Sequence, residues 1–389
     1  MAAPPSDLKI SQQARELHFR SIVVDTHVDT TQRLLEAGFD LGERHANGSV
    51  DIPRLRDGGI SAVFFAIWVP GTVTGREAVK RALAQIEAVR REVSSHPDDL
   101  ILARSAEEIR HARADGRIAI LIGIEGGHMI DCNLDVLRGF ASRGAAYMTL
   151  THMRNTEWAD ASTDPPRHNG LSPLGKEVIA EMNRLGMIVD VSHVSDKAVL
   201  DVLETSEAAV FASHSSCRAL CNSPRNLPDD LIRAIAAKGG LVHINFHVGF
   251  LSQEFIDFES AHPEIEREVE VEAKRRAGEN GARELVEWDR MVREFAGEGK
   301  LPRVKWTLII DHLRRAADIA GIDHVGFGSD FDGACMPFGM EDAAKFPRLT
   351  EALLREGLGE SDIQKILGGN LLRLMEDVEA AAHRGKGSG

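Results

Sequence analysis

The sequence predicts an α/β protein built as one (β/α)8 TIM barrel, and three observations support this fold class. Eight short apolar runs, bounded by turn-forming residues, alternate with amphipathic helical stretches along the 389 residues. No glycine-rich phosphate loop follows the first run, as an open doubly wound sheet would more often show. Histidines or acids stand at the ends of seven of the eight runs, where barrels carry their chemistry. We therefore expect one catalytic domain over residues 1–389.

The expected strands are short runs rich in aliphatic and β-branched residues. They span 21–25, 61–69, 118–125, 145–150, 187–192, 209–213, 241–246 and 324–330.

Stretches with helical periodicity separate these strands and complete the alternation. They span 76–93, 133–144, 173–186, 195–206, 228–240 and 306–321, with a helical region over 341–383 that closes the ring. Ser195 and Pro228 suit helix starts, and glycines suit the positions that follow helix ends.

One interval breaks the alternation, because almost 80 residues separate the seventh and eighth strands. Residues 254–300 are highly charged and favour helix, so we expect a helical insertion over 254–304. A solvated helix pair, a cover over the barrel and a dimer contact all remain open for this arm.

Composition limits the partners. The net charge is −14 with a pI near 5.6, which argues against a nucleic-acid partner. No secretory signal and no run of about 18 apolar residues is present, so we expect neither export nor a membrane span. The four cysteines form no CxxC pair, which favours free thiols and a cytoplasmic protein. Cys217 and Cys221 leave a zinc half-site open, although small buried thiols are more common.

Ionisable residues gather at the strand exits, which share the carboxyl face of a barrel. So many acids repel one another unless a cation offsets their charge, and imidazole with carboxylate is a zinc-type donor set. In strand order these residues are Asp25, His27 and Asp29; Glu125 and His128; His152; Asp190 and His193; His214; His243 and His247; and Asp330 and Asp332.

The pair His27-x-Asp29 has a geometric meaning of its own. Residues i and i+2 of a strand face the same side, so both side chains can reach one ion. By the same rule Asp25 faces inward, where it could orient a ligand as a supporting carboxylate.

Six segments together resemble the membrane dipeptidase (renal dipeptidase) family of binuclear zinc peptidases. The resemblance runs from about residue 20 to the end of the chain, apart from the arm. The segments are "DTHVD" (25–29), "GIEGGH" (123–128), "LTHMRNTEWADAS" (150–162), "GLSPLGKEVIAEMNRLGMIVDVSHVS" (170–195), "FASHSSCRALCNSPRNLPDD" (211–230) and "GFGSDFDG" (326–333).

The resemblance implies a barrel of the metal-dependent hydrolase type that binds two Zn2+ per chain. His27 and Asp29 would bind one zinc, His193 and His214 the other, and Glu125 would bridge both. It also implies that dipeptides, possibly with a D-residue at the C-terminal position, are cleaved by a hydroxide shared between the ions, and that the protein is a homodimer.

Three further residues receive roles from the same resemblance. His152 would contact the substrate and polarise the scissile carbonyl, Arg225 would hold the terminal carboxylate, and Asp330 would handle protons. The residue types suit these roles, because a guanidinium binds a carboxylate with two hydrogen bonds and a carboxylate exchanges protons.

Alternatives remain open at this stage. Arg225 could pair with Asp229 or Asp230 instead, and Asp332 could replace Asp330. His128, His243 and His247 are expected to be supporting or structural groups.

Two rival functions are a barrel amidohydrolase acting on a cyclic amide, lactone or nucleobase, and a non-catalytic metal-binding scaffold. The first usually opens with HxH and bridges its metals with a modified lysine, whereas this chain has HxD and no lysine in 145–150. A non-catalytic scaffold would be expected to have lost one of the metal ligands or Asp330, and none of these residues is missing from the sequence. The arm could reshape the pocket, so side-chain preference does not carry over from the family.

Overall fold

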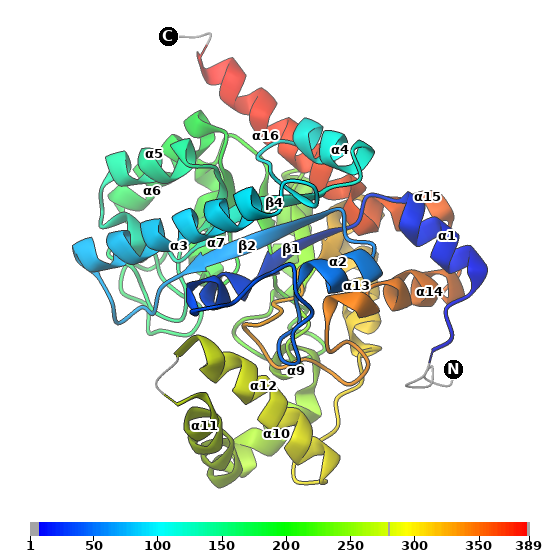
Figure 1. Ribbon diagram of the computed structural model, residues 1–389. Coiled ribbons are helices and arrows are strands. Elements are labelled where there is room, and N and C mark those ends of the chain that lie inside the picture. Colours follow the sequence, from blue (N-terminus) through cyan, green and yellow to red (C-terminus); the bar gives the residue numbers. More distant parts are fainter. Residues whose placement is uncertain (1–7, 279–280, 387–389) are drawn as a thin grey trace.

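The structure, a computed structural model, describes residues 8–278 and 281–386. All strand pairs are parallel, and eight strands follow one another in the order β1-β2-β4-β5-β6-β7-β8-β9 (Figure 1). Their bounds are β1 Val24–Val28, β2 Ala62–Trp68, β4 Ile118–Glu125, β5 Ala145–Thr149, β6 Ile188–Asp190, β7 Val210–Ala212, β8 Leu241–Ile244 and β9 Val325–Phe327.

The last strand meets the first and brings the barrel close to closure. Val28 and Phe331 form a parallel bridge, and the Asp330 N–H donates to the His27 carbonyl over 2.9 Å. The expected (β/α)8 architecture is therefore confirmed, as a nearly closed parallel barrel surrounded by helices.

Each expected apolar run contains a strand, but the first is displaced. The strand was expected over 21–25 and lies at Val24–Val28, so His27 is within it rather than after it. The sequence did not predict β3 (Leu100–Leu102), which pairs only with β4 beside the barrel path. Three residues with one partner strand carry too little pattern to be recognised.

Most expected helices are present within a few residues, and local signals placed their ends well. Ser195 caps α7 by accepting the Ala198 N–H, and Pro228 is the N-cap residue of α8. The helices that coincide with the predicted stretches are α3 Gly75–Ser95, α5 Leu134–Ser142, α6 Pro173–Leu185, α7 Asp196–Thr205, α8 Asp229–Ala237 and α13 Leu308–Ala320.

The region 341–383 is not one helix. Gly357, with φ of 86°, adopts a conformation that L side chains rarely take, and it separates α14 from α15. The region contains η4 Ala343–Lys345, α14 Pro347–Arg355, α15 Glu360–Gln364, η5 Lys365–Gly369 and α16 Asn370–Lys386. Unpredicted short elements elsewhere are α1 Gln12–Arg20, α2 Ile52–Asp57, α4 Ala106–Ala114, α9 Val248–Leu251, η1 Thr30–Leu35, η2 Gly127–Ile130 and η3 Ile322–His324.

Aromatic rings fill the barrel interior below the strand exits. Tyr147 on β5 lies with its ring centroid 5.4 Å from that of Phe64 on β2 and 5.3 Å from that of Phe211 on β7. Gly123 on β4 makes room for this tyrosine, because a Cβ there would lie 2.0 Å from Tyr147 Cζ. This aromatic layer lies directly beneath the strand-exit residues and supports them.

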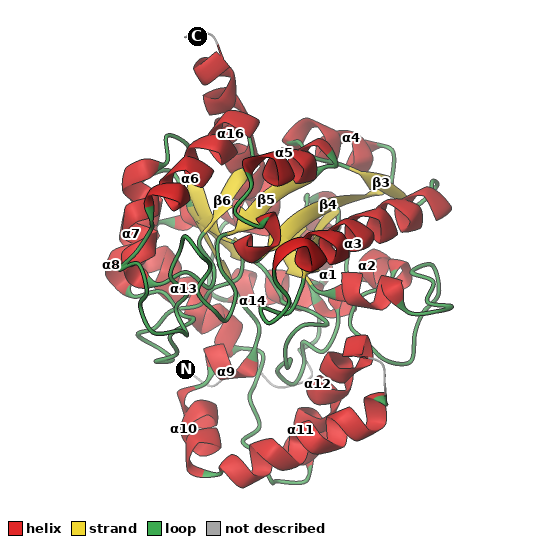
Figure 2. Ribbon diagram, turned by 90° about the vertical axis from the view of Figure 1, so that its left-hand side faces the viewer, coloured by secondary structure: helices red, strands yellow, loops and turns green. Residues whose placement is uncertain are grey.

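The segment after β8 forms three helices, α10 Gln253–Ala261, α11 Pro263–Ala277 and α12 Gly281–Gly297, which we call the arm. The arm leaves the barrel at the carboxyl end of β8, and Figures 1 and 2 both show it as a group set off from the barrel. Its apolar side chains, among them Val269, Met291 and Phe295, form a hydrophobic cluster that also includes Val248 on α9 and Cys335 in the loop after β9. No helix within residues 8–278 and 281–386 is long and apolar enough to cross a bilayer.

Candidate metal centre

The ionisable residues predicted from separate strand exits meet at the carboxyl face around one carboxylate. Glu125 at the end of β4 is 3% exposed. Its Oε1 lies 3.1 Å from His193 Nε2, 3.4 Å from His214 Nε2 and 3.5 Å from His27 Nε2. Three imidazole nitrogens from β1 and from the exits of β6 and β7 therefore converge on a single oxygen.

A second group of donors shares His27. His27 Nε2 lies 3.5 Å from Asp29 Oδ2 and 3.8 Å from Asp330 Oδ1. His152, after β5, places Nε2 3.7 Å from Glu125 Oε1. His152 and Asp330 thus lie as close to the shared donors as ligands would.

The spacing of these atoms fits a bound metal. An ion with tetrahedral bonds of about 2.0–2.2 Å holds its donor atoms roughly 3.3–3.6 Å apart, which is close to most of the separations found. His27 Nε2 is buried and has no hydrogen-bond partner in the described structure, as a lone pair reserved for a metal would require. The residues present therefore fit a metal site.

The charges of the buried groups point the same way. Burial raises the pKa of Asp29 well above its usual range, and the neighbouring Glu125 carboxylate adds to the rise. Burial also acts to raise the pKa of Glu125, but the surrounding imidazoles, His27 first, hold it well below its usual range. A cation between the two carboxylates would remove their repulsion.

Tyr147 orients the first histidine from below. Its hydroxyl lies 2.8 Å from His27 Nδ1 and donates to the Thr26 carbonyl over 3.3 Å. If His27 Nε2 binds a metal, Nδ1 carries the ring proton, and this N–H donates a hydrogen bond to the Tyr147 hydroxyl oxygen. Sequence reasoning missed this residue, although Tyr147 is the only tyrosine of the chain and lies in register with a glycine, Gly123, on the neighbouring strand β4.

His214 is oriented by a different chain of contacts. Its Nδ1 lies 2.7 Å from Ser213 Oγ, and that hydroxyl donates to Asp190 Oδ2 over 2.6 Å. Asp190 also accepts from the Thr149 hydroxyl over 2.5 Å, so one carboxylate ties together the ends of β5, β6 and β7. Asp190 is therefore a supporting residue at the strand exits.

Asp25 supports the site through the backbone. Its Oδ1 accepts the N–H of Ser329 over 2.8 Å and that of His27 over 3.3 Å. The sequence predicted that Asp25 could orient a metal ligand. In the structure Asp25 holds only the backbone of His27, whereas the imidazole ring of His27 is held by Tyr147. Burial raises the pKa of Asp25 to about 6.

Two site residues have an unusual backbone. His193 and Asp330 both have φ of 67°, a region in which residues other than glycine are uncommon. Such conformations cost about 1–3 kcal/mol each and persist where the surrounding structure enforces them, often at functional sites.

Arg225 lies in the loop before α8 with only 4% of its surface exposed. Its Nη2 donates to the His214 carbonyl over 3.3 Å, while Nε and Nη1 are buried without a partner in the described structure. Burial lowers its pKa to about 10, so the guanidinium stays charged at neutral pH. Of the two alternative partners, Asp229 pairs with Arg315 instead, and Asp230 is exposed in the first turn of α8. A buried cation with two unused donors is an anion-binding group.

The other candidates have structural partners. Asp332 accepts the Thr30 hydroxyl over 2.7 Å and the Ser49 N–H over 2.6 Å, so its oxygens are already used. His243 lies inside the barrel with Nδ1 2.8 Å from the Thr26 hydroxyl. His247 Nδ1 accepts the Cys335 N–H over 3.1 Å.

The remaining histidine and the cysteine pair also lie outside the donor groups. His128, after β4, is partly exposed, and burial lowers its pKa. Cys217 and Cys221 are buried free thiols that donate to the carbonyls of His312 and Gly249, and they belong to none of the donor clusters found.

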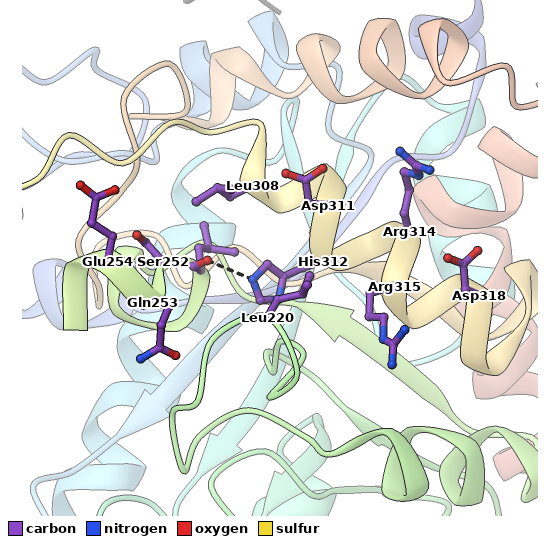
Figure 3. Close-up of a pocket in the computed structure, with 11 residues that line it drawn as sticks. Leu220, Ser252, Gln253, Glu254, Leu308, Asp311, His312, Arg314, Arg315 and Asp318 are labelled. Carbon is purple, nitrogen blue, oxygen red and sulfur yellow. Dashed lines mark hydrogen bonds between the residues drawn. The ribbon is translucent and has the colours of Figure 1, made fainter. Parts of the chain in front are cut away.

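Two other features of the described surface lie apart from the centre. In a cluster of Asp40, Glu92 and His96, one oxygen of each carboxylate accepts a backbone N–H, from Gly42 and Leu41 respectively, so the cluster anchors a loop. A pocket of about 530 Å3 between α13 and the start of α10 holds none of the donor residues (Figure 3).

The protein-family model described as Membrane dipeptidase (Peptidase family M19) matches residues 11–389. The chain belongs to this family. It is a metallo-dipeptidase, a hydrolase of peptide bonds, with a buried histidine and glutamate group that binds metal.

Curated relatives extend the match along almost the whole chain. Dipeptidase 3 of Rattus norvegicus is 32% identical and covers 98% of this chain and 70% of its own length. Dipeptidase aclJ of Aspergillus oryzae is 35% identical over 86% of this chain and 71% of its own. The predicted family is thus confirmed by relatives from animals and fungi.

Solved structures share the fold. A metallo peptidase from Rhodobacter sphaeroides, liganded with a phosphinate mimic of the dipeptide L-Ala-D-Ala, has 27% identity and a TM-score of 0.75, covering 92% of this chain and 99% of that one. The probable dipeptidase PvdM from Pseudomonas aeruginosa has 26% identity and a TM-score of 0.78, covering 95% and 98%.

Proposed function

We propose that this metallo-dipeptidase works with two Zn2+ ions per chain, bound by Glu125 and four residues grouped around it. The observation that carries the proposal is the convergence of three imidazole Nε2 atoms within 3.1–3.5 Å of Glu125 Oε1. Nitrogen and carboxylate donors at this spacing suit zinc. The proposed ligands are His27, Asp29, Glu125, His193 and His214, with Glu125 shared between both ions.

When bound, such a pair of ions supplies Lewis acidity and lowers the pKa of water toward neutrality. The chain's own residues would then position the substrate and move its protons. Arg225 would bind the terminal carboxylate with its two unused donors, which favours dipeptides over longer chains.

His152 and Asp330 are the proposed catalytic side chains. Burial lowers the pKa of His152 to about 4, so its ring is neutral near pH 7 and can donate one N–H to the scissile carbonyl oxygen. Asp330 accepts the Asn245 amide N–H at Oδ2 over 2.9 Å, which fixes its orientation. The Asp330 carboxylate would take the proton of the attacking water and deliver one to the leaving amine.

The acceptance of a D-residue at the C-terminal position is part of the proposal. It is motivated by the L-Ala-D-Ala mimic bound to the Rhodobacter sphaeroides enzyme. A library of L-Xaa-L-Xaa and L-Xaa-D-Xaa dipeptides, assayed with metal analysis of the same sample, tests it together with the metal. We expect metal-dependent cleavage with about two zinc per chain. No cleavage of any dipeptide by the metal-loaded protein would refute the dipeptidase assignment, and a different metal content would refute the zinc pair.

We also propose a homodimer in the cytoplasm. Free thiols at Cys132, Cys217, Cys221 and Cys335 support a reducing compartment, and the family resemblance supports the dimer. Sedimentation at about twice the chain mass of 42.5 kDa is expected, and cell fractionation tests the location. A monomer mass or recovery outside the cytoplasm would contradict the respective part.

A further inference from the structure

Three aromatic rings run in a row from Arg225 to the arm. The Arg225 guanidinium carbon lies 5.1 Å from the centroid of the Phe250 ring. The Phe250 ring lies 4.6 Å from the His247 ring, and the His247 ring lies 5.6 Å from the indole of Trp288 on α12. The row therefore begins at the proposed carboxylate-binding group and ends on the insertion.

The rings of this row are only partly buried, unlike most of the metal centre. Phe250, His247 and Trp288 are each of intermediate exposure, whereas Arg225 is 4% exposed. His247 Nδ1 accepts a backbone N–H from Cys335, so this ring is neutral and presents a largely apolar face. Each of the three rings thus keeps part of its surface accessible.

The placement of Trp288 is fixed by its neighbour in sequence. Asp289 is 7% exposed, and its Oδ1 accepts the N–H of Met336 over 2.8 Å in the loop that follows β9. Arg293, one turn later, pairs with the other Asp289 oxygen at 2.6 Å. The contact of the buried Asp289 carboxylate with the partly exposed Arg293 and its backbone hydrogen bond to Met336 therefore hold this part of α12 against the barrel.

We infer that Trp288 is a specificity-determining residue of the substrate site, which selects dipeptides with a large apolar or aromatic C-terminal residue. The inference rests on the proposed role of Arg225. The C-terminal carboxylate and the C-terminal side chain share one Cα, so a carboxylate on Arg225 brings that side chain to the adjoining rings. Phe250, His247 and Trp288 are those rings, and they favour apolar and aromatic groups.

The test compares C-terminal residues in one dipeptide series. The metal-loaded enzyme is assayed with Ala-Gly, Ala-Leu and Ala-Phe, with both L and D forms of the last two. We expect the native enzyme to prefer Leu or Phe in whichever stereoisomer it accepts. In Trp288→Ala, kcat/KM should fall about tenfold for the Phe substrate and stay within about twofold for Ala-Gly. Trp288→Phe should restore most of the preference.

A matched control separates a direct contact from a loosened arm. Phe295 lies on the same helix, is 6% exposed and belongs to the hydrophobic cluster that includes Val269 and Met291. Phe295→Ala should weaken the arm while the preference for the Phe substrate remains. Equal losses for Ala-Gly and Ala-Phe in Trp288→Ala, or the same pattern in Phe295→Ala, would overturn the inference.

The failure of this inference is distinguishable from failure of the proposed function. A native enzyme that cleaves Ala-Gly best is still a dipeptidase, but Trp288 then does not select apolar residues. A native enzyme that cleaves no dipeptide refutes the proposed function itself.

Discussion

At the scale of single residues, the role of Asp330 depends on contacts with residues that are distant in the sequence. Asp330 lies within reach of the donor groups and also contacts an amide. Its Oδ1 is 3.8 Å from His27 Nε2, and its Oδ2 accepts from Asn245 Nδ2 over 2.9 Å. A proton carrier and a metal ligand would both fit this position, and a single substitution separates them.

Asp330→Asn should keep two zinc per chain and lose about 10²–10⁴-fold in kcat, because the amide cannot exchange the proton. Metal content by elemental analysis and kcat are measured on the same preparation. A variant that loses metal along with activity would make Asp330 a ligand.

Tyr147→Phe should weaken metal binding by about 10–100-fold, because His27 loses the partner that fixes its tautomer while the ring packing stays. Competition with a chelator measures the affinity, and thermal unfolding serves as the control for folding. Gly123→Ala should reproduce the defect, since its Cβ would displace the tyrosine ring. Unchanged affinity in both variants would show that the contact is only structural.

At the scale of elements, the helices that surround the barrel are joined by buried polar contacts. His312 on α13 accepts the Cys217 N–H at Nδ1 over 3.0 Å and lies with Nε2 3.1 Å from the Leu251 carbonyl, the contact drawn in Figure 3. Because a backbone N–H only donates, Nδ1 must be unprotonated and Nε2 carries the proton. One neutral histidine thus joins three segments.

Burial lowers the pKa of His312 from 6.5 to about 4, which makes its contribution to stability pH-dependent. The unfolded chain takes up the proton near pH 6.5 and the folded chain only near pH 4. The contribution of His312 to the free energy of unfolding is therefore fully present above pH 6.5. As the pH falls toward 4, this contribution is lost, and the loss is on the order of 3 kcal/mol.

Denaturant unfolding at pH 7 and pH 5 should show a smaller loss for His312→Asn than for the native protein, because asparagine keeps an acceptor near Nδ1 but does not titrate. Other buried histidines contribute equally to both proteins and cancel in the comparison. Equal losses in the two proteins would rule out His312 as a source of the pH dependence.

At the scale of the whole molecule, the metal centre connects strands that are far apart in the sequence. Its five proposed ligands come from β1, β4 and the exits of β6 and β7. A ligand that binds only the folded chain stabilises it by about 4 kcal/mol at a thousand times its Kd. Removing the metal with a chelator should therefore lower Tm by several degrees, and adding zinc back should restore it. An unchanged Tm in a sample shown to be metal-free would contradict the site.

The barrel could be predicted because its signals are local. Period-two geometry aims His27 and Asp29 at one side, and Ser195 and Pro228 mark helix starts through their own backbone and side chain. β3 and the break at Gly357 were missed because the first has too few residues for a pattern and the second depends on a turn inside a helical stretch.

The sequence by itself determined the fold class, through local periodicity, and the family, through a resemblance carried by short motifs, and that resemblance also supplied the proposed donor residues. Only the tertiary structure decided which side chains hold the donors, because those contacts join distant segments. Tyr147 and His27 are 120 residues apart in the chain, and Ser213 and Asp190 are 23 apart. The same holds for the arm, whose sequence shows only charge and helical periodicity. Packing against the strand exits alone brings Trp288 beside His247, and neither residue's neighbours in sequence specify that contact.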